Sequence, residues 1–281
     1  MPYPKFDRLD VIWDLPESCQ EWEHVEGTLT QLEPHLAGLG FIDHFLFMAT
    51  SKVESIAPHE DERLVVYQIR GEDHELPAYA SEAFMVFKNY GSFYPIPGNV
   101  RIVPVGCRKN TPILPVQQIK DRSIDMFFVG RDDRRDDFFK AIEAYSALVR
   151  RSTEIEIAKS TGASAFYTPE VYAHKMAQSK LALCPRGTSH ETSRIYEAMR
   201  SGCAVIAARQ LPTWFTEGWP VIEIDDWGDI KDVADALLSD EKRLQDISNQ
   251  TRLWWEEKCS EEAVAQYMAR ELSLSLMKQN L

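Results

Sequence analysis

The chain has 281 residues, of which 44% are hydrophobic and 27% charged, a composition typical of a folded globular protein. Its formal net charge of −13 argues against nucleic acid as a partner, because proteins that bind nucleic acid usually carry a basic surface. No window approaches the ~18 apolar residues of a membrane span, and the first residues lack the apolar core of a signal peptide, so we expect a soluble, cytoplasmic protein with no transmembrane segment.

The first part of the chain predicts a set of strands with a helical region near its start. Residues 17–36 predict one or two helices. β-branched and aromatic runs predict strands at residues 9–13, 44–49, 64–69, 83–88 and 100–105. The strand at 64–69 is expected to be a central one. Residues 112–121, with two prolines and few hydrophobic residues, predict a linker between two domains.

The loop at residues 70–77 follows this central strand and holds the candidates for a catalytic base. Asp73 is the first choice and Glu72 the second, because a carboxylate partly desolvated there would have its pKa raised and could accept a proton from a hydroxyl group. His74 is an alternative, since histidine has an unperturbed pKa near neutrality. The other interpretation is a solvated acidic turn, because Gly, Asp and Pro mark loops whatever their function.

A second α/β period follows the linker. Strands are predicted at residues 125–130, 154–158, 181–184, 203–207 and 221–224. Helices are predicted at residues 136–151, 229–238, 241–258 and 261–277, and Thr168-Pro169 predicts a further helix start. The pattern predicts two α/β domains at residues 1–115 and 120–260, with a C-terminal helix within 261–281 that could pack back on the first domain.

The stretch from Leu181 to Ile206 predicts an anion-binding βαβ unit. Thr188, with Glu191 three residues later, reads as a capping box that starts the helix. The free backbone N–H groups of residues 186–189 would then lie at the positive end of the helix dipole, where phosphate binds. Gly202 is expected to end the helix in a left-handed conformation.

Arg194 and Glu197 fall on the face of this helix opposite its apolar residues. They could form an exposed i,i+3 ion pair worth only a few tenths of a kcal/mol, as a rough estimate. The polar loop at residues 186–189 favours ligand binding instead, because open α/β sheets bind ligands at the carboxyl ends of their strands.

Four ordered pieces of the sequence resemble exostosin-like glycosyltransferases. They are Asn99-Val-Arg-Ile-Val-Pro-Val-Gly106, Phe127-Phe-Val-Gly-Arg-x-x-Arg-Arg135, Leu183-Cys-Pro-Arg-Gly-x-x-x-x-x-x-Arg-x-x-Glu-Ala198 and Ser201-Gly-Cys-Ala-Val-Ile206. The last two are fairly specific, and residues 72–77 give a fainter echo. The chain departs from the family in being short and in lacking the luminal membrane anchor of its animal members.

The resemblance implies the GT-B fold, in which two Rossmann-like domains face each other across a cleft. It implies an inverting, metal-independent glycosyltransferase that moves a sugar from a nucleotide sugar to the hydroxyl group of a glycan or other acceptor, in polysaccharide or glycan assembly. Arg194 would bind the donor's diphosphate and Glu197 its ribose. The donor-binding residues expected around them are Arg186, Gly187, Thr188, Ser189, Gly130, Arg131 and Arg134.

Neither a metal nor another cofactor is expected. The sequence shows no Asp-x-Asp motif or His/Asp cluster, and its five scattered cysteines include no Cys-x-x-Cys pair. A metal site built from Asp225 and Asp226 remains an alternative. Two other functions remain open: a non-catalytic nucleotide-sugar-binding or scaffold domain, and a nicotinamide-dependent oxidoreductase, against which no strand is followed by Gly-x-Gly-x-x-Gly.

Overall fold

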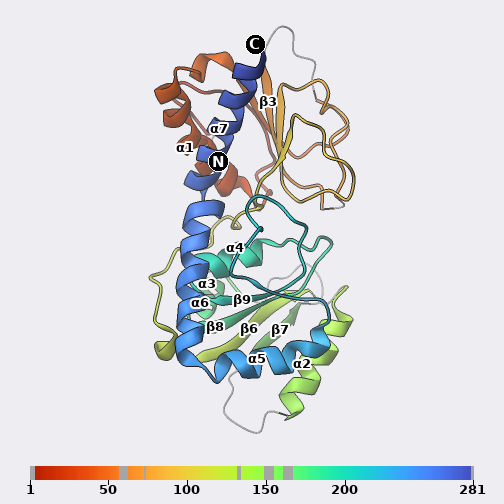
Figure 1. Cartoon of the computed structure of the whole chain (residues 1–281), viewed down its shortest axis with the longest axis vertical. Coiled ribbons are helices and arrows are strands. Elements are labelled where there is room, and N and C mark those ends of the chain that lie inside the picture. The colour runs from red at the N-terminus through yellow and green to blue at the C-terminus, as the bar shows by residue number, and fades with distance from the viewer. Residues whose placement is uncertain are drawn as a thin grey trace. The chain divides into compact units, whose positions relative to one another are not determined.

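A computed structural model describes residues 4–56, 63–72, 74–131, 134–148, 155–160 and 167–279. The chain forms two compact units (Figure 1): Met1–Lys109 together with Lys258–Leu281 (unit 1), and Asn110–Glu257 (unit 2). Each unit contains a five-stranded sheet in which paired strands run parallel. The predicted α/β class is therefore confirmed, and every strand predicted from the sequence is present.

The sheet of unit 1 follows the order of the chain. Its strands are β1 (Asp10–Asp14), β2 (Leu46–Thr50), β3 (Leu64–Gln68), β4 (Met85–Lys88) and β5 (Val100–Ile102). The strand predicted to be central, β3, is the middle one. Strands β2 to β4 are buried along their whole length, as in a parallel sheet covered on both faces.

Two helices cover one face of the unit 1 sheet. They are α1 (Trp22–Leu39), which continues through Pro34, and α7 (Glu261–Gln279). Val264, Met268 and Leu272 of α7 pack into the same core as the leucines of α1. The opposite face is covered by loop residues, among them Tyr79 and Ala83. The C-terminal helix therefore completes the core of the N-terminal unit.

The sheet of unit 2 has the order β10 (Ile222–Ile224), β9 (Ala204–Ala208), β8 (Ser179–Cys184), β6 (Ile124–Arg131) and β7 (Ile155–Ser160). From β6 the chain steps one way to β7 and the other way to β8, β9 and β10. The carboxyl ends of β6 and β8 thus form a topological switch point, the place where open α/β sheets bind ligands.

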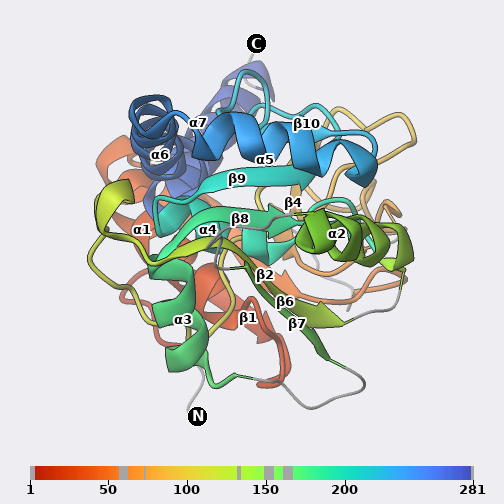
Figure 2. The ribbon, with the colours of Figure 1, turned by 90° about the horizontal axis from the view of Figure 1, so that it is seen from below.

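Helices lie on both faces of the unit 2 sheet. Their bounds are α2 (Asp136–Leu148), α3 (Pro169–Ala177), α4 (Ser193–Arg200), α5 (Ile230–Leu238) and α6 (Glu241–Trp254). Helices α2 and α5 lie side by side on one face (Figure 2). On α3, Thr168 caps the helix by accepting a hydrogen bond from the Val171 N–H, as its sequence predicts. None of the described helices is long and apolar enough to cross a membrane.

The segment predicted to link the domains, residues 112–121, belongs to unit 2. Its prolines keep the backbone irregular, but Ile119 is buried in the unit 2 core. The buried Arg122 guanidinium holds the same region by donating to the carbonyl oxygens of Gln117, Ser179 and Ser201. The chain instead passes from unit 1 to unit 2 at Lys109 and returns at Lys258, inside a π-helix (Trp255–Cys259) that replaces the last turn of the α-helix predicted at 241–258.

We expect Arg122→Met to lower the free energy of unfolding by about 3 kcal/mol or more, because three carbonyl groups would lose a charged donor. The measurement is urea unfolding of the full chain followed by tryptophan fluorescence. Arg243→Met is the control, since the Arg243 side chain is exposed on α6 and should change stability by less than ~0.5 kcal/mol. Equal effects of the two substitutions would contradict the role given to Arg122.

Candidate functional site

The loop at residues 185–192 connects β8 to α4 at the switch point of unit 2. The predicted capping box at Thr188 and Glu191 is wrong, because α4 begins only at Ser193. The Glu191 carboxylate accepts a hydrogen bond from the Tyr196 hydroxyl at 2.5 Å, and the Gly187 N–H donates to the Ser189 carbonyl. Residues 186–189 are therefore a folded loop in front of the helix. Gly202 does end the helix in the left-handed region, with φ 66°.

Arg194, near the start of α4, points at the carboxyl end of β6. Its Nη2 donates to the Val129 carbonyl at 2.5 Å, and its guanidinium lies 4.4 Å from the centroid of the Phe128 ring. Only 8% of Arg194 is exposed, yet no carboxylate among the described residues pairs with it, and its Nε–H has no hydrogen-bond partner there. The exposed ion pair with Glu197 is thus not formed.

Gly130 makes this placement of Arg194 possible. A Cβ atom at Gly130 would lie 3.0 Å from Nη2 of Arg194 and 2.9 Å from Cζ of Phe128. Because Phe128 is packed against Phe138 and Phe139, its ring cannot give way. Gly130, one of two glycines in the predicted donor-binding set, therefore leaves the space into which the Arg194 guanidinium fits.

Arg135 is a second cation of the site, which the sequence analysis missed. Its guanidinium lies 5.6 Å from the centroid of the same Phe128 ring, and its Nη1 donates to the Arg131 carbonyl. Its Nη2 lies so near Gly187 that a Cβ atom there would be 3.1 Å away. Arg131 and Arg134, the predicted residues, are exposed. Arg135 is the last residue of the second motif that resembles exostosin-like glycosyltransferases, and this position was the signal in the sequence that could have identified it.

The site is therefore a half-buried positive region where the loops after β6 and β8 meet. Two guanidiniums share one aromatic ring, which attracts cations to its face. Cys184 lies at the end of β8, where burial raises the pKa of its thiol to about 12, so it stays neutral and is no nucleophile near pH 7. An anion fits this arrangement best.

Glu197 occupies a different environment from Arg194. It is 1% exposed, and its Oε2 accepts a hydrogen bond from the Tyr172 hydroxyl of α3 at 2.6 Å. The structure thus shows Glu197 in the contact between α3 and α4. Its assignment to a ribose stays a prediction.

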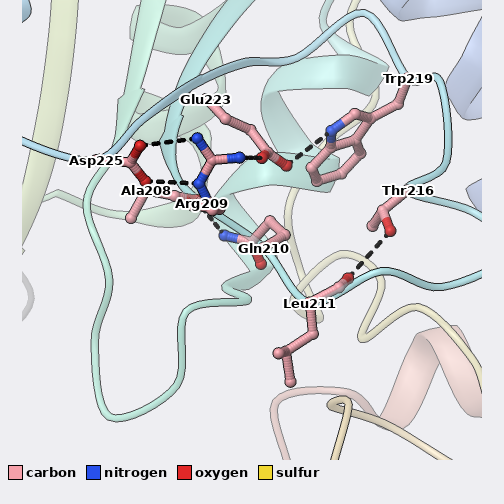
Figure 3. A network of polar contacts seen from close by, with 8 residues as sticks. All are labelled: Ala208, Arg209, Gln210, Leu211, Thr216, Trp219, Glu223 and Asp225. Carbon is pink, nitrogen blue, oxygen red and sulfur yellow. Dashed lines mark hydrogen bonds and ion pairs between the residues drawn. The ribbon is translucent and has the colours of Figure 1, made fainter.

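Polar contacts join the residues at the carboxyl ends of β9 and β10 (Figure 3). Arg209 binds Asp225 through two hydrogen bonds of 2.6 and 2.7 Å, and this ion pair lowers the pKa of Asp225. Gln210 donates to the His190 carbonyl, which ties the strand β9 to the loop after β8. Asp226 caps the N–H of Gly228. A cation held by Asp225 and Asp226 would have to displace Arg209.

In unit 1, polar residues lie next to one another at the carboxyl ends of neighbouring strands. We call this side of the sheet its edge. Asp14 pairs with Thr50, Thr50 with Gln68, and Gln68 with Lys88. Their side chains share the face that loops cover, because Met48, Val66 and Val86 precede three of them by two residues. Thr50, Gln68 and Lys88 are fully buried, and the Thr50 hydroxyl donates to Asp14 at 2.9 Å.

The candidate bases lie beside this row. Asp73 falls outside the described residues, and Glu72 is exposed. His74 is buried, with its Nδ1 at 2.7 Å from the Gly91 carbonyl oxygen. Because a carbonyl oxygen only accepts, Nδ1 carries the proton, and Nε2 is the proton-accepting nitrogen of the neutral ring.

Backbone strain gathers at the same edges. The described non-glycine residues with positive φ are Arg70, His74, Tyr90, Asn110 and Arg134. The first three follow β3 and β4 in unit 1, and Arg134 follows β6 in unit 2. Such conformations cost roughly 1–3 kcal/mol each and cluster at functional sites, so they support both edges as candidates.

Comparisons with known proteins give a fold but no family. No family model and no curated protein matches the sequence. In structure the chain is similar to sucrose-phosphate synthase from Thermosynechococcus elongatus, with a TM-score of 0.53 and 13% identity over 96% of both chains. It is also similar to the GtfA/B complex, with a TM-score of 0.53 and 13% identity over 89% of this chain and 60% of that one.

A third similar structure is a variant of TarM from S. aureus in complex with fondaparinux, α-GlcNAc-glycerol and UDP, with a TM-score of 0.54 and 15% identity over 88% of this chain. The chain spans only 58% of the TarM chain and 60% of the GtfA/B chain. What is shared at these identities is the fold. The α/β fold with two parallel-sheet units, the GT-B class predicted from the sequence, is confirmed.

We expect Gly130→Ala to lower the free energy of unfolding by about 1–3 kcal/mol, because the added methyl group meets a ring that cannot move. Gly98→Ala is the matched control, since nothing lies within 4 Å of its Cβ position. Thermal unfolding followed by circular dichroism compares the two. A Gly130→Ala protein as stable as the control would show that Phe128 and Arg194 are less tightly placed than described.

Proposed function

We propose that the protein is a glycosyltransferase that moves a sugar from a nucleotide-sugar donor to a hydroxyl acceptor. The observation that carries the proposal is the pair Arg194 and Arg135 at the switch point, with a buried Arg194 Nε–H that lacks a partner in the described structure. A diphosphate would fill that position. The similarity in fold to a TarM structure that contains UDP supports the choice of a nucleoside diphosphate.

The chemistry follows from the charges of unit 2. As the bond to the sugar breaks, negative charge develops on the departing nucleoside diphosphate, and guanidiniums fixed in a half-buried site stabilise that charge. In this proposal Arg194 and Arg135 bind the diphosphate. The loop residues Arg186, Gly187, Thr188 and Ser189 border it, and two exposed arginines lie at the last residue of β6 (Arg131) and just after the strand (Arg134). Metal independence is proposed on the same ground, since the guanidiniums supply the compensating charge.

The acceptor hydroxyl needs a base, which we place in unit 1. His74 is built into the loop after β3 by its hydrogen bond to Gly91, whereas the Glu72 side chain is exposed. A base that deprotonates the acceptor directly suits a single displacement, and hence inversion of the anomeric centre. Membership of the exostosin-like family, a place in glycan assembly and a cytoplasmic location remain predictions.

Arg194→Met tests the donor site, because it removes the charge and keeps most of the packing against Phe128. We expect kcat/KM to fall by roughly tenfold to a thousandfold with whichever of the UDP-, GDP-, CMP- or dTDP-sugars the protein uses. UDP binding measured by thermal shift should weaken in parallel. Arg243→Met again serves as the control and should behave like the wild type. Unchanged rates in a folded Arg194→Met protein would remove the phosphate role. UDP binding without transfer from any of these donors would point to the non-catalytic alternative.

His74→Asn tests the base. The Asn amide can still donate to the Gly91 carbonyl and tolerates the left-handed backbone, but it has no counterpart of Nε2. We expect kcat to fall by roughly 10² to 10⁴ while UDP binding and melting temperature are kept. Glu72→Gln should leave kcat near the wild-type value. Full activity of His74→Asn together with a large loss in Asp73→Asn would transfer the role to Asp73.

A further inference from the structure

The loop that follows β4 is uncharged and aromatic. Residues 89–99 contain no Asp, Glu, Lys or Arg, in a chain in which 27% of residues are charged. Phe93 and Tyr94 expose 61% and 64% of their surface, and Ile96 exposes 44%. Exposed aromatic side chains that are neighbours in the sequence offer an apolar surface to which another molecule can bind.

The start of this loop is held by buried polar groups. The fully buried Lys88 ammonium donates to the carbonyl oxygens of Asn89 and Tyr90, at 2.8 and 2.7 Å. Tyr90 is left-handed, and the next carbonyl, that of Gly91, accepts the hydrogen bond from His74. A buried charge is costly unless its hydrogen bonds are satisfied, and these two carbonyl oxygens accept hydrogen bonds from the ammonium, so the Lys88 side chain fixes the conformation of this turn.

The aromatic rings themselves are also positioned. The Phe93 ring lies 4.3 Å, centroid to centroid, from the His74 imidazole. The Tyr94 N–H donates to the Ser92 hydroxyl, and at the far end of the loop the Asn99 amide donates to the carbonyl oxygens of Ala80 and Ala83. The exposed rings therefore stand on a loop that is anchored at both ends, next to the candidate base.

We propose that Phe93 and Tyr94 bind the acceptor as a neutral sugar ring stacked on their exposed faces, beside His74. This inference rests on the proposed function and names the class of its acceptor. One face of a sugar ring presents C–H groups, which the negative face of an aromatic ring attracts, and its rim presents hydroxyl groups for polar neighbours such as the Tyr94 hydroxyl. The absence of charge from residues 89–99 matches a neutral acceptor rather than an anionic one.

The test is saturation-transfer NMR on the full chain with three probes: methyl β-D-glucopyranoside, methyl β-D-galactopyranoside and methyl α-D-mannopyranoside. We expect at least one to bind, with the strongest transfer to C–H protons of one ring face. Phe93→Ala and Tyr94→Ala should each raise its Kd about tenfold, which corresponds to ~1.4 kcal/mol. Phe93→Trp, which keeps an aromatic face, should stay within about twofold of the wild type.

Ile96→Ala is the matched control, because it removes exposed apolar surface from the same loop without removing a ring. Its Kd should equal that of the wild type, and an equal loss there would overturn the aromatic assignment. No transfer from any probe to a wild-type protein that binds UDP, GDP, CMP or dTDP would overturn this inference and leave the proposed donor site standing. A wild-type protein that binds none of these nucleotides would reject the proposed function itself. Phosphatidylcholine vesicle binding that depends on Phe93 and Tyr94, with glycoside binding unaffected, would assign the loop to a lipid surface instead.

Discussion

Within each unit, paired strands run parallel, so the residues that follow the strands emerge at one edge of the sheet. This constraint determines where polar side chains can lie without an unmet hydrogen-bonding group and where they lie close enough to act together. In unit 2 it brings the loop after β6 close to the start of α4, so that Arg135 and Arg194 both lie over the Phe128 ring. In unit 1 it aligns Asp14, Thr50, Gln68 and Lys88 at the last residues of their strands, on the face that loops cover.

The two edges solve the problem of buried charge in different ways. The Lys88 ammonium donates hydrogen bonds to backbone carbonyls, and these bonds fix the conformation of a turn. Among the residues that the structure describes, Arg194 contacts the face of the Phe128 ring and donates to the Val129 carbonyl, and its Nε–H has no hydrogen-bond partner. The Lys88 ammonium thus fixes the shape of a loop, whereas the Arg194 guanidinium can still bind an anion. The chemistry proposed for the protein needs both.

Much of this organisation could be predicted from the sequence. Buried parallel strands such as β3 read as continuous apolar runs, and the Thr168-Pro169 start of α3 depends only on local geometry. What failed depended on distant partners. Glu191 would cap a helix from Thr188 in isolation, but the Tyr196 hydroxyl takes its carboxylate.

The predicted exposed ion pair of Arg194 and Glu197 failed for a related reason. A face argument assumes that one side of a helix is solvated, and α4 is buried from Arg194 to Arg200. Arg134 was predicted for the site and Arg135 was not, and the backbone conformation between them, with φ of 61° at Arg134, could not be predicted from the sequence. The α/β class could be predicted from the order of the elements, whereas the GT-B class was implied by the resemblance of four short motifs, and the chemistry of each site required the contacts.

The return of the chain to unit 1 has a consequence for biosynthesis. Unit 2 is one continuous segment, Asn110–Glu257, whereas the core of unit 1 needs Val264, Met268 and Leu272 from the last helix. During vectorial synthesis unit 2 can therefore close its core while α7 is still inside the ribosome, and unit 1 can complete its core only after α7 has emerged. Over that interval the apolar side of α1 is uncovered. This N-terminal segment is therefore the one that we expect a chaperone to bind on the nascent chain.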